Sequence, residues 1–227
     1  MKKKNYKDLH VSLFMLTAFI LWTIAVSFID VKAIGPEGSS VGFATVNSAV
    51  RNFIGVHMSL YHITDWLSLV PIFVAMGFAV LGLVQWIKRK KLSKVDYSIF
   101  VLGGFYIVVF SVYILFEFVT VNYRPVLISG ILETSYPSST TLLVLCVMPT
   151  AIMQLKNRID NTLIRKYVSL FITAFIIFMV TGRLISGVHW FTDIVGGALL
   201  STSLVMMYRF FVSLMANEKN DNQNICP

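Results

Sequence analysis

Six long runs of apolar residues, nearly free of charge, are spaced along the chain. They cover Val11–Ile29, Trp66–Ile87, Tyr97–Phe116, Ser138–Leu155, Tyr167–Gly182 and Ile194–Met215. A helix of about 20 residues crosses a hydrocarbon core of roughly 30 Å, and only a helix lets an isolated segment satisfy its own backbone hydrogen bonds in lipid. The pattern therefore predicts an all-α, polytopic membrane protein with six transmembrane helices.

The composition agrees with this prediction. Of the 227 residues, 56% are hydrophobic and only 13% are charged, whereas soluble domains usually carry about a quarter charged residues. These values exclude an ordinary soluble domain, a disordered chain and a small disulfide-stapled module. Cys146 lies within the fourth run and Cys226 in the polar tail. Because the two cysteines belong to different layers, no disulfide is expected.

The positive charge is explained by topology. A net charge of +8 would suggest a nucleic acid partner in a soluble protein, but most of the 19 Lys and Arg residues lie near the termini and in alternate connections. The exceptions are Lys32, Arg51, Arg124 and Arg183. The positive-inside rule then predicts that both termini are cytoplasmic, and no nucleic acid partner is needed. The tail 217–227 is predicted to be a disordered cytoplasmic segment.

The longest connection on the predicted outer side is the segment 30–65. Apolar residues recur at helical spacing over Phe43–Ile54, which predicts an amphipathic helix lying on the membrane interface. Such a helix can be a lid over a lipid site or a packing helix over the bundle, and both interpretations are open. His57 and His62 are five residues apart, which favours interfacial histidines over a metal site. Asp65 is a candidate partner of His62.

The strongest chemical signal is the segment 182–193, which reads GRLISGVHWFTD. His189 and Asp193 are four residues apart, so on a helix they lie on one face within hydrogen-bond reach. A carboxylate that accepts one ring N–H fixes the tautomer and leaves the other nitrogen free as a nucleophile or base. Arg183 carries a guanidinium group, which binds phosphate oxygens through paired hydrogen bonds. The segment therefore predicts phosphate chemistry.

Two other outer segments point to the same chemistry. Arg124 lies in the connection before the fourth run, and Pro137 and Ser138 are typical of a helix N-terminus. The free backbone N–H groups of such a terminus bind anions. By itself Ser138 would be interpreted as a simple helix cap. Together with Arg124 and the segment 182–193, it predicts an anion site shared by three segments.

These residues together resemble the type-2 phosphatidic acid phosphatase family, which shares its fold with the vanadium haloperoxidases. The family has three motifs: Lys-x6-Arg-Pro, Pro-Ser-Gly-His and Ser-Arg-x5-His-x3-Asp. The matching residues, in the same order and spacing, are Arg124, Pro125, Pro137, Ser138, Arg183, His189 and Asp193. The resemblance covers about 97–215, so residues 1–227 are expected to form a single membrane domain with a phosphatase-like core.

The resemblance implies a role for each matched residue. His189 would attack phosphorus to form a phosphohistidine, and Asp193 would orient it. The residues implied to hold the phosphate are Arg124, Ser138, Ser139, Thr140 and Arg183. The family needs no metal, so neither a metal nor another cofactor is expected. Two arginines that position the phosphate and neutralise its charge would supply much of the catalysis.

The sequence departs from the family at three positions. Glu117 stands in place of the motif-one lysine, Ser139-Thr140 in place of Gly-His, and Gly182 in place of serine. Threonine has no useful acidity near neutral pH, so losing the general acid costs about 10²–10⁴ in rate. Glu117 would repel a phosphate unless it is paired with an arginine or protonated. If it is protonated by burial in the outer leaflet, it could replace the lost acid and join the catalytic residues.

The preferred hypothesis is a membrane enzyme that hydrolyses or transfers phosphate from a lipid phosphate or a polyprenyl diphosphate. The site would face the extracytoplasmic side of the plasma membrane. The alternative is a catalytically impaired relative that binds a lipid headgroup or a protein partner. A transporter is disfavoured, since no pair of Gly/Pro-interrupted spans occurs in matching halves. The enzyme is preferred because the nucleophile, its orienting carboxylate and both arginines occur together.

Overall fold

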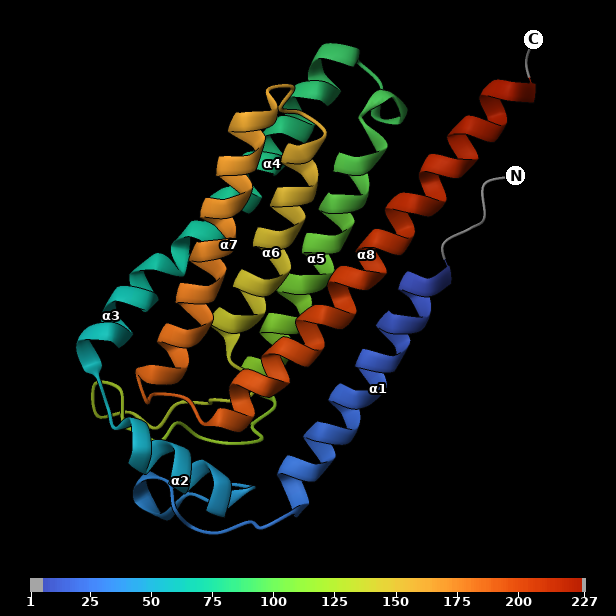
Figure 1. Cartoon of the computed structure of the whole chain (residues 1–227). Coiled ribbons are helices and arrows are strands. Elements are labelled where there is room, and N and C mark those ends of the chain that lie inside the picture. The colour runs from blue at the N-terminus through green and yellow to red at the C-terminus, as the bar shows by residue number, and fades with distance from the viewer. Residues whose placement is uncertain (1–5, 226–227) are drawn as a thin grey trace.

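The structure is a computed structural model that describes residues 6–225, and helices make up most of it (Figure 1). The helices are α1 (Tyr6–Phe28), α2 (Ala44–Ile54), α3 (Met58–Leu67), α4 (Leu69–Arg89), α5 (Tyr97–Phe118), α6 (Ser139–Lys156), α7 (Thr162–Ile185) and α8 (Phe191–Ile225), with short 3-10 turns at Pro36–Gly38 and Leu92–Lys94. Within the described residues, 6 helical stretches are long and apolar enough to cross a membrane. This confirms the predicted all-α membrane protein.

Two of the spans are longer than the hydropathy pattern predicts. The second comprises α3 and α4, which together form an apolar stretch over Met58–Arg89. The helix is interrupted between them because Pro71 has no N–H to donate to the carbonyl four residues before it. The fifth span, α7, begins at Thr162 because the Asn161 side chain caps it, accepting hydrogen bonds from the next two free backbone N–H groups.

The last helix also extends beyond its predicted span. Helix α8 continues to Ile225, through most of the segment for which the sequence predicts disorder. Cys226 lies outside the described residues. Cys146 is a buried free cysteine in α6, so the prediction about a disulfide between the two stays a prediction.

Helix α6 lies at the centre of the bundle (Figure 1). In the apolar 18-residue stretch of α6, 61% of the residues are buried inside the protein, whereas in that of α3–α4 only 11% are buried. The peripheral helices direct large apolar side chains outward, among them Phe14, Phe73, Ile107 and Phe171. Apolar side chains on the outside are stable only against lipid. The burial pattern therefore distinguishes one protein-enclosed helix from five that face the bilayer.

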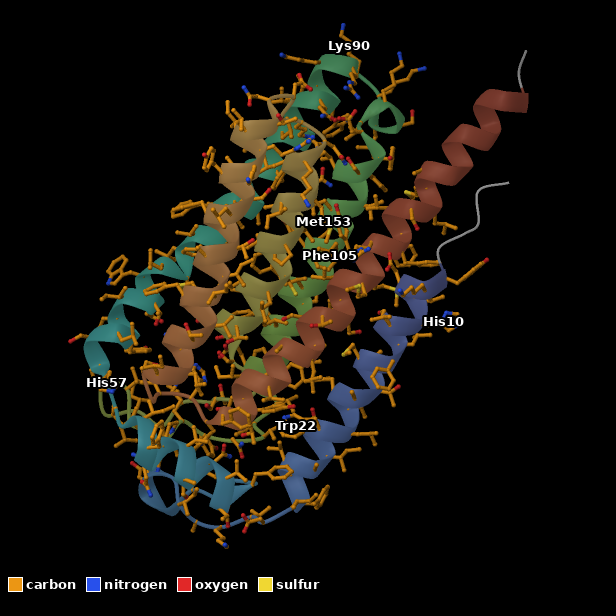
Figure 2. The ribbon with its side chains drawn as sticks, in the orientation of Figure 1. His10, Trp22, His57, Lys90, Phe105 and Met153 are labelled. Atoms are coloured by element: carbon orange, nitrogen blue, oxygen red, sulfur yellow. The ribbon has the colours of Figure 1, made fainter. Side chains whose placement is uncertain are left out.

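The two ends of the bundle differ in content. The start of α1, the end of α8 and the connections α4–α5 and α6–α7 lie at one end (Figure 1). Lys90 marks this end, and His57 lies at the opposite one (Figure 2). That opposite end, here called the site end, carries α2, the loop 119–138 and the connection between α7 and α8. The connections predicted to lie outside the cell therefore share one end of the molecule.

The predicted amphipathic helix corresponds to α2, at the site end. Its polar residue Asn47 is buried and donates from Nδ2 to the Gly42 carbonyl at 2.8 Å and to the Thr192 hydroxyl at 3.0 Å. Phe53, by contrast, is 91% exposed. The helix thus turns its polar side toward the protein and an apolar side outward. Of the two interpretations that the sequence leaves open, these contacts favour a packing helix over the bundle.

Candidate active site

The loop 119–138 between α5 and α6 folds back on itself like a narrow hairpin. Ser129 and Gly130 both have positive φ, 53° and 79°, and connect two facing residues, Ile128 and Ile131, that exchange backbone hydrogen bonds. A two-residue turn of this kind favours glycine, which adopts positive φ without steric cost. The fold-back brings residues from the two arms of the loop side by side.

Arg124 lies on one arm of this loop and is 9% exposed. Its backbone N–H donates to the Glu133 carbonyl at 3.0 Å, and its Nε lies 3.0 Å from the Glu133 carboxylate. Its Nη1 lies 3.3 Å from Nε2 of His189. The loop therefore places a guanidinium group directly against the predicted nucleophilic nitrogen, with a carboxylate behind it.

His189 is 5% exposed and precedes α8, in the turn between α7 and α8. Its Nδ1 lies 3.2 Å from the Ser135 carbonyl and 3.1 Å from the Ser135 hydroxyl oxygen, whereas the Asp193 carboxylate is 3.7 Å away. The Ser135 hydroxyl donates to Asp193. The expected direct bond between His189 and Asp193 is thus replaced by a relay through Ser135.

Asp193 has a further role in its own helix. It lies in the first turn of α8, is fully buried, and accepts a hydrogen bond from the backbone N–H of Trp190 at 2.8 Å. The indole N–H of Trp190 in turn donates to the Tyr123 carbonyl at 2.8 Å. These bonds fasten the turn that carries His189 to the loop 119–138, so the orientation of the imidazole is set by both segments.

The surroundings keep the His189 imidazole neutral. Burial, and then the positive charges of Arg124 and Arg183, lower the pKa of His189 well below its usual value of 6.5. When Nδ1 carries the ring proton and donates it to the Ser135 carbonyl, the neutral ring has its lone pair on Nε2. The geometry therefore provides the protonation state that a nitrogen nucleophile needs near neutral pH.

Arg183 forms another wall of the site, in the last turn of α7, and is 2% exposed. Its guanidinium nitrogens lie 3.4 Å from the Asp65 carboxylate and 3.5 Å from the Thr64 hydroxyl. The Tyr61 ring lies 5.1 Å from this guanidinium group and 6.0 Å from that of Arg124, a cation–π geometry with both. One face of α3 therefore supports both arginines.

The tight packing of α3 on α7 explains one departure from the family motifs. A Cβ atom at Gly182 would lie 2.8 Å from Cγ2 of Thr64. A serine at this position would therefore force the two helices apart or move Thr64. Glycine is the residue that allows α3 to approach Arg183 so closely.

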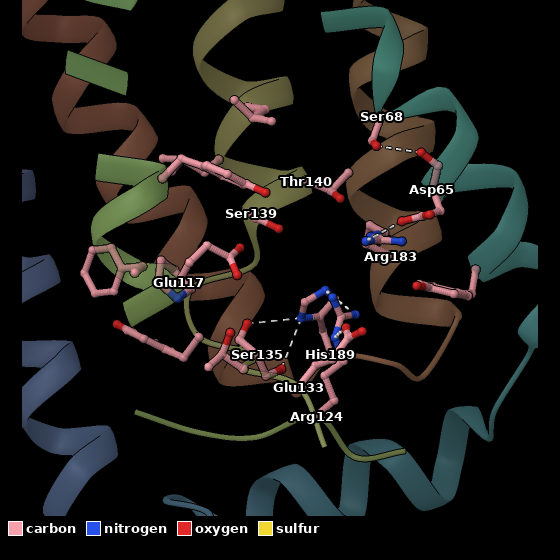
Figure 3. A pocket seen from close by; sticks show the side chains of 18 of the residues that line it. Asp65, Ser68, Glu117, Arg124, Glu133, Ser135, Ser139, Thr140, Arg183 and His189 are labelled. Atoms are coloured by element: carbon pink, nitrogen blue, oxygen red, sulfur yellow. Dashed lines mark hydrogen bonds and ion pairs between the residues drawn. The ribbon is translucent and has the colours of Figure 1, made fainter. Parts of the chain in front are cut away.

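The two walls and α6 enclose a cavity of about 670 Å³ at the site end (Figure 3). Of the residues predicted for the site, those that line it are Glu117, Arg124, Ser139, Thr140, Arg183 and His189. Ser138 and Asp193 lie behind the cavity wall, each 0% exposed. The Ser138 hydroxyl accepts a hydrogen bond from Thr141 N–H and so caps α6.

Four residues of the site were not anticipated from the sequence: Tyr61, Asp65, Glu133 and Ser135. The sequence suggests Asp65 only as a partner of His62, whereas the structure pairs it with Arg183. His57 and His62 are exposed at the surface. Ser135 had one available signal, since it directly precedes the Tyr-Pro-Ser-Ser segment of the second motif.

Three comparisons with known proteins bear on this arrangement. Residues 109–216 match the PAP2 superfamily. The structure is similar to the crystal structure of the first transmembrane PAP2 type phosphatidylglycerolphosphate phosphatase from Bacillus subtilis, with a TM-score of 0.56 and 19% identity over 91% of this chain and 96% of that one. No curated protein matches the chain.

The matched residues 109–216 include both arginines, His189 and Asp193. At 19% identity the likeness to the Bacillus protein establishes the fold. The resemblance recognised from the sequence motifs agrees with the family model, which matches residues 109–216, a little under half of the chain.

Proposed function

We propose that this protein is a lipid phosphatase that hydrolyses or transfers phosphate from a lipid phosphate or diphosphate through a phosphohistidine. The observation that carries the proposal is the position of His189, whose Nε2 lies 3.3 Å from Arg124 at the wall of a cavity that Arg183 also lines. A nucleophile and two phosphate-binding cations in one cavity are the minimum set for phosphoryl transfer without a covalent cofactor.

The reaction proceeds in two displacements at phosphorus. The lone pair on Nε2 of His189 forms a bond to phosphorus, and the bond to the leaving oxygen breaks with its electron pair on that oxygen, which then takes a proton. Water, or an alcohol acceptor, next attacks the phosphorus and gives up a proton. The N–P bond breaks and its electron pair returns to Nε2. Arg124 and Arg183 stabilise the charge on the phosphoryl oxygens in both steps.

The relay through Ser135 supports the nucleophile during both displacements. When Nε2 bonds to phosphorus, positive charge develops on the imidazole ring. The Ser135 carbonyl and hydroxyl hold the Nδ1 proton, and the hydroxyl is itself oriented by the buried Asp193. These contacts fix the tautomer and favour the charged ring, as a carboxylate does in other imidazole-dependent sites.

The proton for the leaving oxygen comes from a group other than the one that the family uses. Thr140 lines the cavity at the position of the motif-two histidine, and its hydroxyl is too weak an acid for this role. Glu117 also lines the cavity and is the sequence-based candidate donor. A diphosphate leaving group needs less protonation than an alkoxide, so the loss of the family's general acid costs less rate with a polyprenyl diphosphate than with a phosphate monoester.

An apolar groove next to the cavity supports a lipid substrate. It has a volume of about 830 Å³, lies between α4 and α5, and shares Ile72 and Phe110 with the cavity that holds His189. Along α5 its lining extends from Ile114 to Ile99, which is about 22 Å of helix. A phosphate bound at the arginines can therefore keep its hydrocarbon chain between two membrane helices.

The site is proposed to face the extracytoplasmic side of the plasma membrane. The opposite end of the bundle carries the basic residues 88–91, at the end of α4 and just after it, and 165–166, near the start of α7. Positively charged connections are retained in the cytoplasm. Accessibility of a cysteine introduced at Phe53 to a membrane-impermeant thiol reagent in whole cells would test this orientation.

A second candidate function is headgroup binding without turnover. Both arginines already have carboxylate partners, and Arg124 contacts the nucleophilic nitrogen itself. A site closed in this way can hold an anion while remaining slow in chemistry. This alternative predicts saturable lipid binding without phosphate release.

The deciding experiment is phosphate release by the purified protein from phosphatidate, lysophosphatidate, phosphatidylglycerol phosphate and undecaprenyl diphosphate. We expect release from at least one substrate, a loss of at least about 10³-fold in His189→Ala, and no change in His10→Ala. His10 is a matched control because it is exposed on α1. Acid-labile labelling of the wild-type protein, absent from His189→Ala, would detect the phosphohistidine. Equal release by the wild type and His189→Ala would contradict the proposal.

A further inference from the structure

The cavity of the candidate active site contains more negative than positive side chains. Arg124 is paired with Glu133 and Arg183 with Asp65. A third carboxylate, Glu117, lines the same cavity, and none of the ion pairs in the described part of the chain includes it. With the imidazole neutral, one carboxylate of the cavity has no cationic partner, because the hydrogen bond of Glu117 is with the Tyr113 hydroxyl.

The Glu117 carboxylate lies apart from the arginines. Glu117 extends from the end of α5, and in Figure 3 its carboxylate points into the cavity while Arg183 and Arg124 lie on the far side. Arg183 comes from α7 and Arg124 from the loop 119–138. The cavity is therefore polarised, with two guanidinium groups at one side and a carboxylate without a cationic partner at the other.

The arginine side has an open requirement for an anion. The Nε atom of Arg183 is buried and has no hydrogen-bond partner among the described residues. The contacts that its Nη atoms make with Asp65 and Thr64 are long, at 3.4 and 3.5 Å. A buried donor without a partner is costly. Because a guanidinium group has five N–H donors, Arg183 can keep its carboxylate partner and still bind a phosphate oxygen.

We infer that the cavity binds a phosphate ester that also carries an ammonium group, as a zwitterionic phospholipid headgroup does. The phosphate lies at Arg124 and Arg183, and the ammonium group lies at Glu117. The inference rests on the proposed function, because it uses the same cavity and the same phosphate-binding arginines. It specifies the class of headgroup.

The electrostatics of the two ligand classes differ at Glu117. A phosphate monoester without a cation brings another anion into a cavity that already has a carboxylate without a cationic partner, and like charges in one cavity repel. A zwitterionic headgroup gives each charge a partner of opposite sign. The replacement of the motif-one lysine by Glu117 thus changes which class of headgroup the cavity prefers.

The test compares the binding of two short-chain lipids, phosphatidylethanolamine and phosphatidate, to the full-length protein in detergent by titration calorimetry. The wild type should prefer phosphatidylethanolamine, and Glu117→Gln should lose about fivefold of that preference, the worth of one exposed ion pair. Glu37→Gln is the matched control, because Glu37 is an exposed carboxylate in the first loop, outside the cavity. It should keep the preference.

A modified ligand gives a second measurement that needs no variant. N-acetylation of the phosphatidylethanolamine removes the positive charge, so it should weaken binding to the wild type by the same factor and leave binding to Glu117→Gln unchanged. Tighter binding of phosphatidate by the wild type, or an unchanged preference in Glu117→Gln, would overturn the inference.

The outcomes also separate this inference from the proposed function. A preference for the amine that depends on Glu117, with no phosphate release from any lipid, would contradict the enzyme and support the inference. His189-dependent phosphate release from phosphatidate, with no preference for the amine, would support the enzyme and overturn the inference.

Discussion

The two arginines of the site are held in opposite ways. Arg183 is fixed on a membrane helix, almost fully enclosed, and in contact with three residues of α3. Arg124 lies on a hairpin-like loop, and its carboxylate partner Glu133 has a side chain that is 40% exposed. The helix provides rigidity at the cost of burying a charge, while the loop places a guanidinium group against His189. Arg183 therefore also supports the packing of α3 on α7, whereas Arg124 can adjust its position with the loop that carries it.

The largest effect is expected from replacing each arginine by lysine, which cannot donate to a phosphate and a carboxylate in the same forked geometry. Both Arg183→Lys and Arg124→Lys should lower kcat/KM by about 10²–10³-fold. Only Arg183→Lys should also lower Tm, because Arg183 joins α7 to three residues of α3, whereas Arg124 is carried on a loop. Phosphate release and thermal unfolding in detergent measure the two effects.

Arg51→Lys is the control for this comparison, since Arg51 lies over the Trp190 ring at the same end of the protein and outside the cavity. It should leave kcat/KM unchanged. Equal losses of Tm in Arg183→Lys and Arg124→Lys would show that the helix-held and loop-held arginines do not differ in structural role.

A smaller effect is expected at the loop side from Ser135→Ala. The substitution removes the hydroxyl between His189 and Asp193 and leaves the Ser135 carbonyl to hold the Nδ1 proton. One lost hydrogen bond to a developing charge corresponds to about tenfold in kcat, with KM unchanged because phosphate binding is not touched. Ser135→Thr, which keeps the hydroxyl, should restore most of the rate. A rise in KM instead would place Ser135 in substrate binding.

The smallest effect is expected at the helix side from Gly182→Ser, which introduces the family residue. Its Cβ would contact the Thr64 methyl group at 2.8 Å, so the free energy of unfolding should fall by about 1 kcal/mol, at the lower end for overpacking because only one methyl group must move. Thr64→Ser removes that methyl group and keeps the hydroxyl. The double variant should therefore recover the loss, and a double-mutant cycle measures the coupling. Additive losses would contradict the proposed contact.

The fold was largely predictable because its dominant signal is local. Each span is a run of apolar residues, and lipid requires such a run to be helical. The boundaries were less predictable where side chains outside the runs determine them. The cap at Asn161 lengthens α7, and Pro71 divides one apolar stretch into α3 and α4. Neither effect changes the hydropathy of the span itself.

The site was predictable where the motif fixes the chemistry and unpredictable where packing does. Arg124, Arg183 and His189 were identified from their types and spacing, and the structure places all three at one cavity. The pairing of Asp65 with Arg183 depends on how α3 lies against α7, because the two residues are more than 100 positions apart in the chain. The Ser135 relay depends on the fold-back of the loop 119–138. No local pattern encodes either contact.

The Tyr61 ring, which lies beneath both guanidinium groups, has a consequence for how this architecture can be dissected. Tyr61 precedes the superfamily match at residues 109–216. A fragment trimmed to the recognisable region would retain the whole catalytic signature and lose the platform on which its cations rest. The segment that carries the motifs is therefore shorter than the set of residues that builds the pocket. A graft of this site onto a relative would have to include α3 as well.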